Sequence, residues 1–337
     1  MERFPSPYAA VLAICSDLDE TPDAETYFEL MRFLNTTETT SMGQGVGLEV
    51  GNSIYFDMAP DQFSYWNTDE KSREKIRMLI KSGRIDCLHS YGDLAATRAH
   101  AGRALEELER HNCRLSVWID HAVAPTNFGP DIMRGHGDEP GHPAYHADLT
   151  FAHGIRYVWR GRVTSVIGQD RPLSLGGIAN WQHPLASATT VAKELAKQTL
   201  ARCGGGKYSL HAPNRILRPV RLRDNRCQGF EFLRCNPHWH GVSSCDTGWG
   251  IARVLTGKFL DRLVARRGTC ILYTHLGKLG AGRRILDEPA VRSFQRLGDY
   301  YRSGKILVTT TKRLLDLCSR ASNGPAPAWP RLEFPTL

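Results

Sequence analysis

The sequence predicts an α/β protein, a distorted (β/α)7–8 barrel of mainly parallel strands with long irregular insertions. Three observations lead to this fold class. About seven short apolar runs alternate with longer segments of helical periodicity, no segment is repeated along the chain, and 337 residues are enough for one large barrel or about two domains. An open, doubly wound sheet shows the same alternation, so periodicity leaves that alternative open.

The N-terminal half supplies the first units of the alternation. Thr21-Pro22-Asp23 is a typical helix start, and Gly51-Asn52 indicates a hairpin turn within 48–58. In chain order the predicted elements are strand 9–15, helix 23–35, the hairpin, helix 69–82, strand 84–89, helix 97–112, strand 114–119, an irregular segment 122–143, a short helix near 145–153 and strand 155–159.

The C-terminal half opens with a long irregular region, 161–228, which carries one clear helix at 189–202. The alternation then returns as strand 230–235, helix 250–266, strand 270–274, helix 288–303, strand 305–309 and helix 311–318. We expect residues 1–322 to form a single barrel domain. Residues 323–337 are a Pro-rich tail that we expect to run over its surface.

Composition excludes several classes of protein. With 41% apolar and 23% charged residues, the chain is neither disordered nor fibrous. No run approaches the roughly 20 apolar residues that cross a bilayer, and the N-terminus lacks the basic head of a signal peptide. Nine cysteines, an odd number without a CxxC pair, indicate free thiols in a reducing compartment. We therefore expect a cytoplasmic protein.

The formal net charge of +8, from 43 basic and 35 acidic residues, suits an anionic ligand or surface. The two signs are interspersed along the chain and no long basic run occurs, so nucleic-acid binding is not expected as the main function.

Three predicted strands end in chemistry-bearing residues. Asp17 and Asp19 follow the first strand and point to the same side, His89 and Asp93 follow the third, and His275 follows the seventh. In a parallel sheet these ends share one mouth, where ligands bind. Two acids and a histidine can hold a divalent metal with a position open for water, while a further carboxylate and histidine act as base and acid.

An ordinary structural role is the alternative for each position. Asp19 could cap the helix that starts near Thr21, and Asp93 the helix that starts near Thr97. Capping requires neither His89 nor the later histidine, so the three strand ends together favour a site over caps.

The motifs at these strand ends resemble those of the NodB-homology polysaccharide deacetylases, carbohydrate esterase family 4. Ser16-Asp17-Leu18-Asp19 resembles that family's pair of adjacent aspartates, with one residue between. His89-Ser90-Tyr91-Gly92-Asp93 resembles its His-Ser/Thr-x-x-His motif, with Asp in place of the second His. Leu272-Tyr273-Thr274-His275 resembles its Leu-x-His motif, with one extra residue. The resemblance covers residues 9–310 in strand order and indicates a divergent member.

The resemblance implies a metal-dependent (β/α)-barrel hydrolase that removes acetyl or other small acyl groups from amino sugars. It implies Asp19, His89 and Asp93 as metal ligands, Asp17 as the catalytic base and His275 as the acid, with the two aspartates able to exchange roles. The implied cofactor is a divalent metal, zinc before cobalt, nickel, manganese or iron.

Two other functions account for part of the pattern. Asp17-Leu18-Asp19-Glu20-Thr21 also resembles the Asp-x-Asp-x-Thr motif of haloacid dehalogenase phosphatases, which use Mg²⁺, but no late strand ends in a paired acidic motif. A non-catalytic carbohydrate-binding barrel is the third possibility, although binding alone does not require His89 and His275.

Further residues are candidates for substrate contacts. After the strand at 230–235, Trp239 offers a flat face for a sugar ring, and Arg234 or His238 could bind a carboxylate or phosphate. The same segment, with Cys235, Cys245 and Asp246, lacks the usual spacing of a zinc site. The remaining candidates are His121 at the end of the fourth strand, and His146 and Asp148 at the start of a short helix.

The expected substrate is a carbohydrate, in a nucleotide- or lipid-linked form. Without a secretion signal, cell-wall trimming is not expected, and the +8 charge suits phosphates or an anionic leaflet. We therefore expect no transmembrane segment and at most peripheral membrane contact. The sequence leaves the oligomeric state open.

Overall fold

The computed structural model describes residues 4–122, 124–173, 178, 184–237, 246–280, 282, 284–320 and 329–337. The strands of the main sheet are β1 (Ala10–Ser16), β4 (Gly51–Ile54), β5 (Ile85–His89), β6 (Val117–Ile119), β7 (Tyr157–Trp159), β8 (Val163–Thr164), β9 (Leu217–Pro219), β10 (Phe230–Phe232), β11 (Arg234–Cys235), β12 (Thr269–Thr274) and β13 (Ile306–Thr309). A separate hairpin consists of β2 (Thr39–Thr40) and β3 (Gly43–Gln44).

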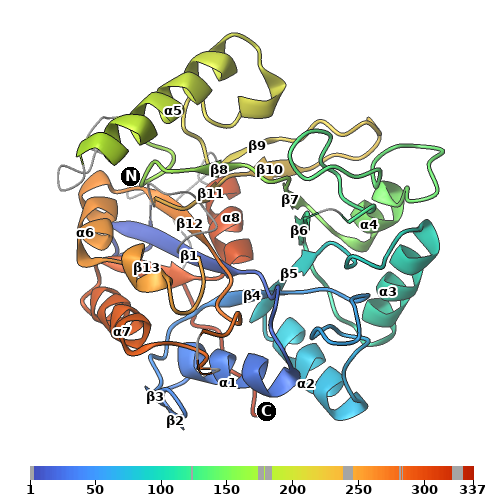
Figure 1. Ribbon diagram of the computed structural model, residues 1–337, viewed down its shortest axis with the longest axis horizontal. Coiled ribbons are helices and arrows are strands. Elements are labelled where there is room, and N and C mark those ends of the chain that lie inside the picture. Colours follow the sequence, from blue (N-terminus) through green and yellow to red (C-terminus); the bar gives the residue numbers. More distant parts are fainter. Residues whose placement is uncertain are drawn as a thin grey trace.

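The helices are α1 (Ala24–Asn35), α2 (Glu70–Lys81), α3 (Arg98–Arg110), α4 (Ala147–His153), α5 (Pro184–Arg202), α6 (Gly257–Arg266), α7 (Glu288–Arg302) and α8 (Thr311–Arg320). Short 3₁₀ helices are η2 (Gly206–Tyr208) and η4 (Ile251–Arg253). Helices α1, α2, α3, α6 and α7 are arranged around the outside of the curled sheet, whereas α8 lies near the middle of the view (Figure 1).

The main sheet is mostly parallel and strongly curled, with the hydrogen-bonded order β8-β11-β12-β1-β4-β5-β6-β7-β10-β9 and β13 paired with β1. The pairing of β9 with β10 is antiparallel. The α/β class is thus confirmed and the sheet forms a strongly curled half-barrel, while closure into the predicted (β/α) barrel stays a prediction. Because its parallel strands point the same way, their carboxyl ends lie along one rim of the curl.

Helix starts follow the predicted capping rules. The side chains of Asp23, Asp69 and Asp287 each accept a hydrogen bond from the backbone amide three residues on, at 2.7–2.8 Å, and so begin α1, α2 and α7. Asp23 and Thr97 occupy the N-cap positions of α1 and α3. The capping role considered for the two strand-end aspartates is therefore filled by other residues.

Two local predictions are wrong. Gly51-Asn52 is not a hairpin turn but part of β4, which lies parallel between β1 and β5. Glycine is required there because a Cβ would collide with the carboxylate of Asp86. The helix predicted over 250–266 is divided into η4 and α6, since the hydroxyl of Thr256 accepts a hydrogen bond from the amide of Phe259 at 3.1 Å and starts a new helix.

Three apolar clusters hold the fold together. One packs α2 and α3 against β5 and its neighbours, and a second packs α6 and α7 against β1, β12 and β13. The third fills the inside of the curl, where period-two alternation turns one side chain in two inward. Its members include Val11, Ala13, Cys15, Cys87, Val117, Trp159, Phe232, Tyr273 and the α8 residues Leu314, Leu315 and Leu317.

The described part of the C-terminal tail, 329–337, packs back onto the domain. The amide of Leu332 donates to the carboxylate of Glu49 at 3.2 Å, and the guanidinium of Arg313 donates to the carbonyl of Pro330 at 2.6 Å. Glu49 lies two residues before the start of β4, so the tail lies near the amino ends of the strands, away from the carboxyl-end rim.

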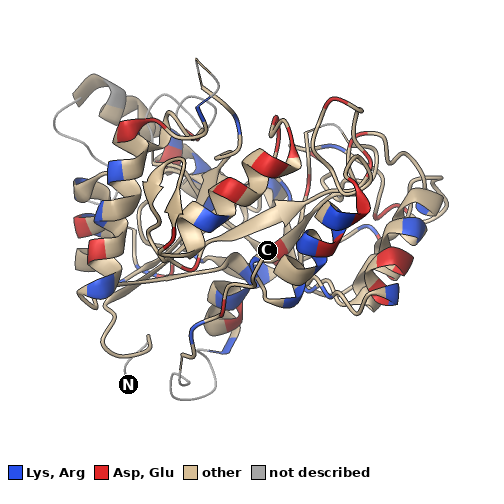
Figure 2. Cartoon of the chain, turned by 90° about the horizontal axis from the view of Figure 1, so that it is seen from below, with Lys and Arg blue, Asp and Glu red and all other residues tan. Residues whose placement is uncertain are grey.

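Three general expectations can be compared with the structure. No helix among the described residues is long and apolar enough to cross a membrane. Basic and acidic residues are interspersed on the helices in Figure 2. Of the eight cysteines within the described ranges, none is in a disulfide; most are buried, whereas Cys203 is exposed.

Candidate metal centre

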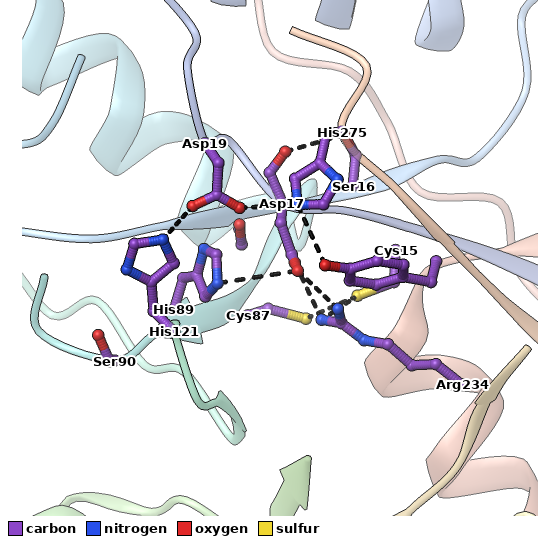
Figure 3. Close-up of polar contacts among 12 residues, drawn as sticks. Cys15, Ser16, Asp17, Asp19, Cys87, His89, Ser90, His121, Arg234 and His275 are labelled. Carbon is purple, nitrogen blue, oxygen red and sulfur yellow. Dashed lines mark hydrogen bonds and ion pairs between the residues drawn. The ribbon is translucent and has the colours of Figure 1, made fainter. Parts of the chain in front are cut away.

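Side chains from four strand ends meet at the carboxyl-end rim. Asp17 and Asp19 follow β1, His89 is the last residue of β5, His121 follows β6, and His275 follows β12 (Figure 3). The register of β5 and β6 places His89 opposite Ile119, so that His121, two residues after Ile119, lies beside His89. The structure thus brings together the strand-end residues of β1, β5 and β12, and β6 adds a fourth contributor.

Asp19 is the centre of this arrangement. Its Oδ1 forms an ion pair with Nε2 of His121, and its Oδ2 lies 2.9 Å from Nε2 of His275. Two groups of potential ligand atoms share this carboxylate, with all atoms of a group within 4.8 Å of one another. One group is Asp19, His89 and His121, and the other is Asp17, Asp19 and His275.

Asp17 is held by a buried arginine. The two guanidinium nitrogens of Arg234 donate to the two carboxylate oxygens of Asp17 at 2.6 and 2.9 Å, and one of them also contacts Sγ of Cys15 at 3.1 Å. The guanidinium lies 4.0 Å from the ring centroid of Trp159. Arg234, predicted as a substrate contact, is fully buried and instead fixes the orientation of Asp17.

His275 is held by a carboxylate that sequence reasoning did not assign to it. Nδ1 of His275 lies 3.0 Å from Oδ2 of Asp246, and the hydroxyl of Tyr273 lies 3.2 Å from Nε2. A backbone bridge between Thr247 and His275 aligns the two segments. Asp246 follows no motif and is 29 residues distant in sequence, so only this pairing reveals its role.

Asp93 is not placed where a metal ligand is expected. Its Oδ1 lies 2.7 Å from Nδ1 of His121, it is 37% exposed, and it belongs to neither ligand group. The reason is local: Ser90 and Gly92 have positive φ and turn the chain away after β5. A Cβ at Gly92 would collide with the backbone of Asp57, so the turn requires glycine. The ligand assignment from sequence is corrected: Asp93 orients His121.

His121, with Asp19 and His89, occupies the position in the ligand group for which the resemblance implied Asp93. Its ring lies edge-on to that of His89, with centroids 4.7 Å apart, and both rings contact Tyr55. The sequence predicts His121 as a substrate contact, or as a support for the residues that touch the substrate, because it closes the fourth strand and should face the same mouth. A histidine after a strand end was the available signal.

The charges of these groups are strongly coupled. Burial lowers the pKa of His89 to about 4, and its Nδ1 has no hydrogen-bond partner. Burial also opposes protonation of His121 and His275, but the hydrogen bonds that the two rings donate to the carboxylates around them, Asp19 above all, raise both pKa values to about 10. Burial would raise the pKa of Asp19, yet the three histidines hold it well below its usual range.

The charges of these side chains favour a bound cation. Clustered carboxylates at the rim bind positive charge, which protons on His121 and His275 can supply. A divalent ion supplies the same charge and releases such protons as it binds, which couples metal affinity to pH. A carboxylate with two imidazoles, one of them with a partnerless buried nitrogen, fits zinc or a similar ion.

The other predicted substrate contacts do not reach this site. His146 is fully buried, with Nδ1 2.7 Å from the Thr150 hydroxyl and Nε2 2.8 Å from the carbonyl of Thr126. Asp148 forms a bidentate ion pair with Arg98 at 2.6 and 2.8 Å. Both predictions are corrected: these residues stabilise the start of α4.

The segment after β11 is only partly described. His238 and Trp239, predicted as substrate contacts, lie outside the described residues, as does Cys245. Cys235 does not face the metal centre, because its thiol donates to the carbonyl of Val166 at 3.3 Å.

Comparison with known proteins adds no relative. No protein-family model matches the chain, and neither a curated protein nor a solved structure matches it.

Proposed function

We propose that this chain is a metal-dependent hydrolase that removes an acetyl or other small acyl group from an amino sugar or glycan intermediate. One observation carries the proposal: a carboxylate and two imidazoles that can hold a metal lie between a fixed carboxylate and a fixed imidazole, Asp17 and His275. Metal-assisted hydrolysis of an amide or ester uses these three parts, namely an ion, a base and an acid.

Asp19, His89 and His121 are the proposed ligands, and the ion is zinc or another divalent transition metal. When bound, the ion would polarise the acyl carbonyl and lower the pKa of its water. The second possible group, Asp17 with Asp19 and His275, is less suitable because it would occupy the two residues left for proton transfer.

Asp17 is the proposed base. Arg234 fixes both of its oxygens, so the carboxylate keeps one orientation while it accepts the proton of the attacking water. Asp17 itself is buried, at 1% exposure, which limits the access of bulk water to its carboxylate.

His275 is the proposed acid. The contact of its Nδ1 with Asp246 orients the ring so that Nε2 faces the centre, where it can give a proton to the leaving amine or hydroxyl. Asp246 acts as a positioning residue and stabilises the protonated ring.

The proposed relationship to (β/α)-barrel deacetylases also has support in the sheet. β10 pairs with β7 and β11 pairs with β12, and only Leu233 lies between β10 and β11. The segment 230–235 therefore links the two sides of the curl, as a strand of a distorted barrel does.

Metal analysis of the full chain tests the ligand assignment. We expect about one equivalent of a transition metal in the purified protein and its loss in His89→Ala and His121→Ala. Asp93→Ala should retain metal with affinity weakened about 10–100-fold, since Asp93 contacts only the ligand. His136→Ala, which removes an exposed imidazole elsewhere, is the matched control. Metal that is absent from the wild-type chain, or unaffected by both ligand changes, contradicts the site.

Activity is then measured as acetate release from N-acetylated amino sugars. We expect a chelator to abolish it and zinc or cobalt to restore it. Asp17→Asn should remove activity while metal is retained, which separates the base from the ligands. Phosphate release from a phosphomonoester with Mg²⁺, without acetate release, would instead favour the phosphatase. Sugar binding without turnover would favour the binding barrel.

A further inference from the structure

A cavity lies between α5 and the carboxyl ends of β8 and β11. Its volume is about 370 Å³, within the range of small-molecule sites. The carboxyl ends of β8 and β11 supply Ser165 and Asn236 to its wall, and α5 and η2 supply the opposite side. Figure 1 shows α5 at the outer edge of the curl, next to β8.

The wall of this cavity is basic. Lys193 and Lys197 come from α5 and Lys207 from η2. Glu194 is the acidic residue among those that line the cavity, and its carboxylate is paired with the ammonium of Lys197 at 2.8 Å. Among the described residues, Lys193 and Lys207 form no ion pair, so the rim carries two positive charges that no nearby carboxylate balances.

A buried histidine faces the same cavity. The side chain of His211 is 3% exposed, and its Nδ1 has no hydrogen-bond partner. The carboxylate of Glu194 lies 3.8 Å away, beyond hydrogen-bond distance, and its oxygens already accept from Thr164, Ser165 and Lys197. Burial and Lys197 lower the pKa of His211 to about 4, which leaves a neutral ring with an unused polar atom. Such an atom is costly unless a ligand satisfies it.

The cavity is close enough to the metal centre for one substrate to reach both. β11 lies between β8 and β12, and Cys235 is level with Leu272, three residues before His275. The two strand spacings from β8 to β12 amount to about 10 Å and lead to His275, whose Nε2 lies 2.9 Å from Oδ2 of Asp19, while His89 and His121 lie farther along the sheet. A hexose with one substituent is long enough to extend from the cavity toward His275. Asn236 also follows Arg234 by two residues and so lies on the same face of the segment as the partner of Asp17.

We propose that this cavity binds a phosphoryl group carried by the substrate. The ammonium groups of Lys193 and Lys207 neutralise its charge, and His211 with the hydroxyl of Tyr208 supplies polar contacts. A phosphoryl group suits this wall better than a carboxylate, because it carries more charge and accepts more hydrogen bonds. The role as a substrate subsite rests on the proposed hydrolase function; the binding of the anion does not.

Calorimetry of the full chain tests the inference with three probes: N-acetylglucosamine 1-phosphate, N-acetylglucosamine and inorganic phosphate. We expect the sugar phosphate to bind at least tenfold more tightly than the sugar, and Lys193→Ala/Lys207→Ala to weaken it at least tenfold. Lys71→Ala/Lys81→Ala removes the same charge from the exposed side of α2 and should leave binding unchanged. His211→Leu should weaken binding while the two lysines remain.

Chelation separates this site from the metal centre. Phosphate binding that survives chelation and disappears in the lysine variant supports the cavity, even if the chain holds no metal and the hydrolase proposal fails. Phosphate binding that disappears on chelation and is unchanged in the lysine variant contradicts the cavity as the phosphate site and places the phosphate at the metal centre instead. Lysine-dependent binding to phosphatidic acid vesicles but not to the sugar phosphate would assign the rim to a lipid surface and overturn the substrate subsite.

Discussion

Replacement of Arg234 by methionine is expected to destabilise the fold strongly. Arg234 is fully buried and the carboxylate of Asp17 is 2% exposed, so removal of the guanidinium leaves a buried anion without its partner. Burial opposes the charged form of Arg234, but Asp17 raises the pKa of the guanidinium, which therefore stays cationic. The two side chains form a complete buried ion pair.

The magnitude follows from the contacts. Two hydrogen bonds between charged groups, at 2.6 and 2.9 Å, are lost, each worth about 1.5–3 kcal/mol. Loss of one member of a buried pair costs about 3–5 kcal/mol in total. We expect Arg234→Met to lower the free energy of unfolding by that amount. Removal of both charges, in Arg234→Met/Asp17→Asn, should recover at least about 2 kcal/mol of the sum of the single changes.

Urea denaturation followed by circular dichroism measures these free energies. Arg292→Met on α7 breaks an ion pair whose partners are 56% and 76% exposed, and should change stability by no more than about 0.5 kcal/mol. A cost below about 1 kcal/mol for Arg234→Met would refute the buried pair. So would a double variant whose loss equals the sum of the two single variants.

Three further predictions concern other parts of the molecule. Burial lowers the pKa of His146 to about 4, so its contribution to stability is complete above about pH 6.5 and is lost as the pH falls toward 4. Urea denaturation at several pH values between these limits gives the slope of the free energy of unfolding against pH. In His146→Gln we expect that slope to be smaller by about 1.4 kcal/mol per pH unit. Asp246→Ala should keep the metal, by elemental analysis, but lower the turnover of acetate release about 10–100-fold because His275 loses its orientation. Gly51→Ala should lower the free energy of unfolding, measured in thermal or urea unfolding, by about 1–3 kcal/mol because the new Cβ meets the carboxylate of Asp86 on β5. Gly102→Ala on α3 is the control: its Cβ meets no neighbouring atom, so the change should stabilise the fold by about 0.5–1 kcal/mol. Equal effects of the two changes would contradict the steric argument.

Much of the secondary structure was predictable from local patterns. Strands such as Ala10–Ser16 and Thr269–Thr274 are continuous apolar runs, and Asp23, Asp69 and Asp287 begin helices through their own side chains. These features depend on neighbours in sequence. The hairpin at Gly51 was mispredicted because a glycine that allows close approach of a side chain looks the same in sequence as one that allows a turn.

The candidate site was predictable only in part. The rule that parallel strands expose their carboxyl ends at one rim pointed to Asp17, Asp19, His89 and His275, and the structure brings them together. The sequence by itself determined which strands contribute and which residue types arrive. It could not rank Asp93 against His121 as a ligand, since both follow strands by a few residues.

Tertiary structure decided the partners. The burial of Arg234 against Asp17, the pairing of Asp246 with His275 and the turn that moves Asp93 behind His121 depend on segments 28–217 residues apart. Local sequence contains no record of such contacts, because the free energy of a buried charge depends on what the folded chain places around it. The strand ends follow from the sequence, and the proposed division into ligands, base and positioning residues rests on the packing between them.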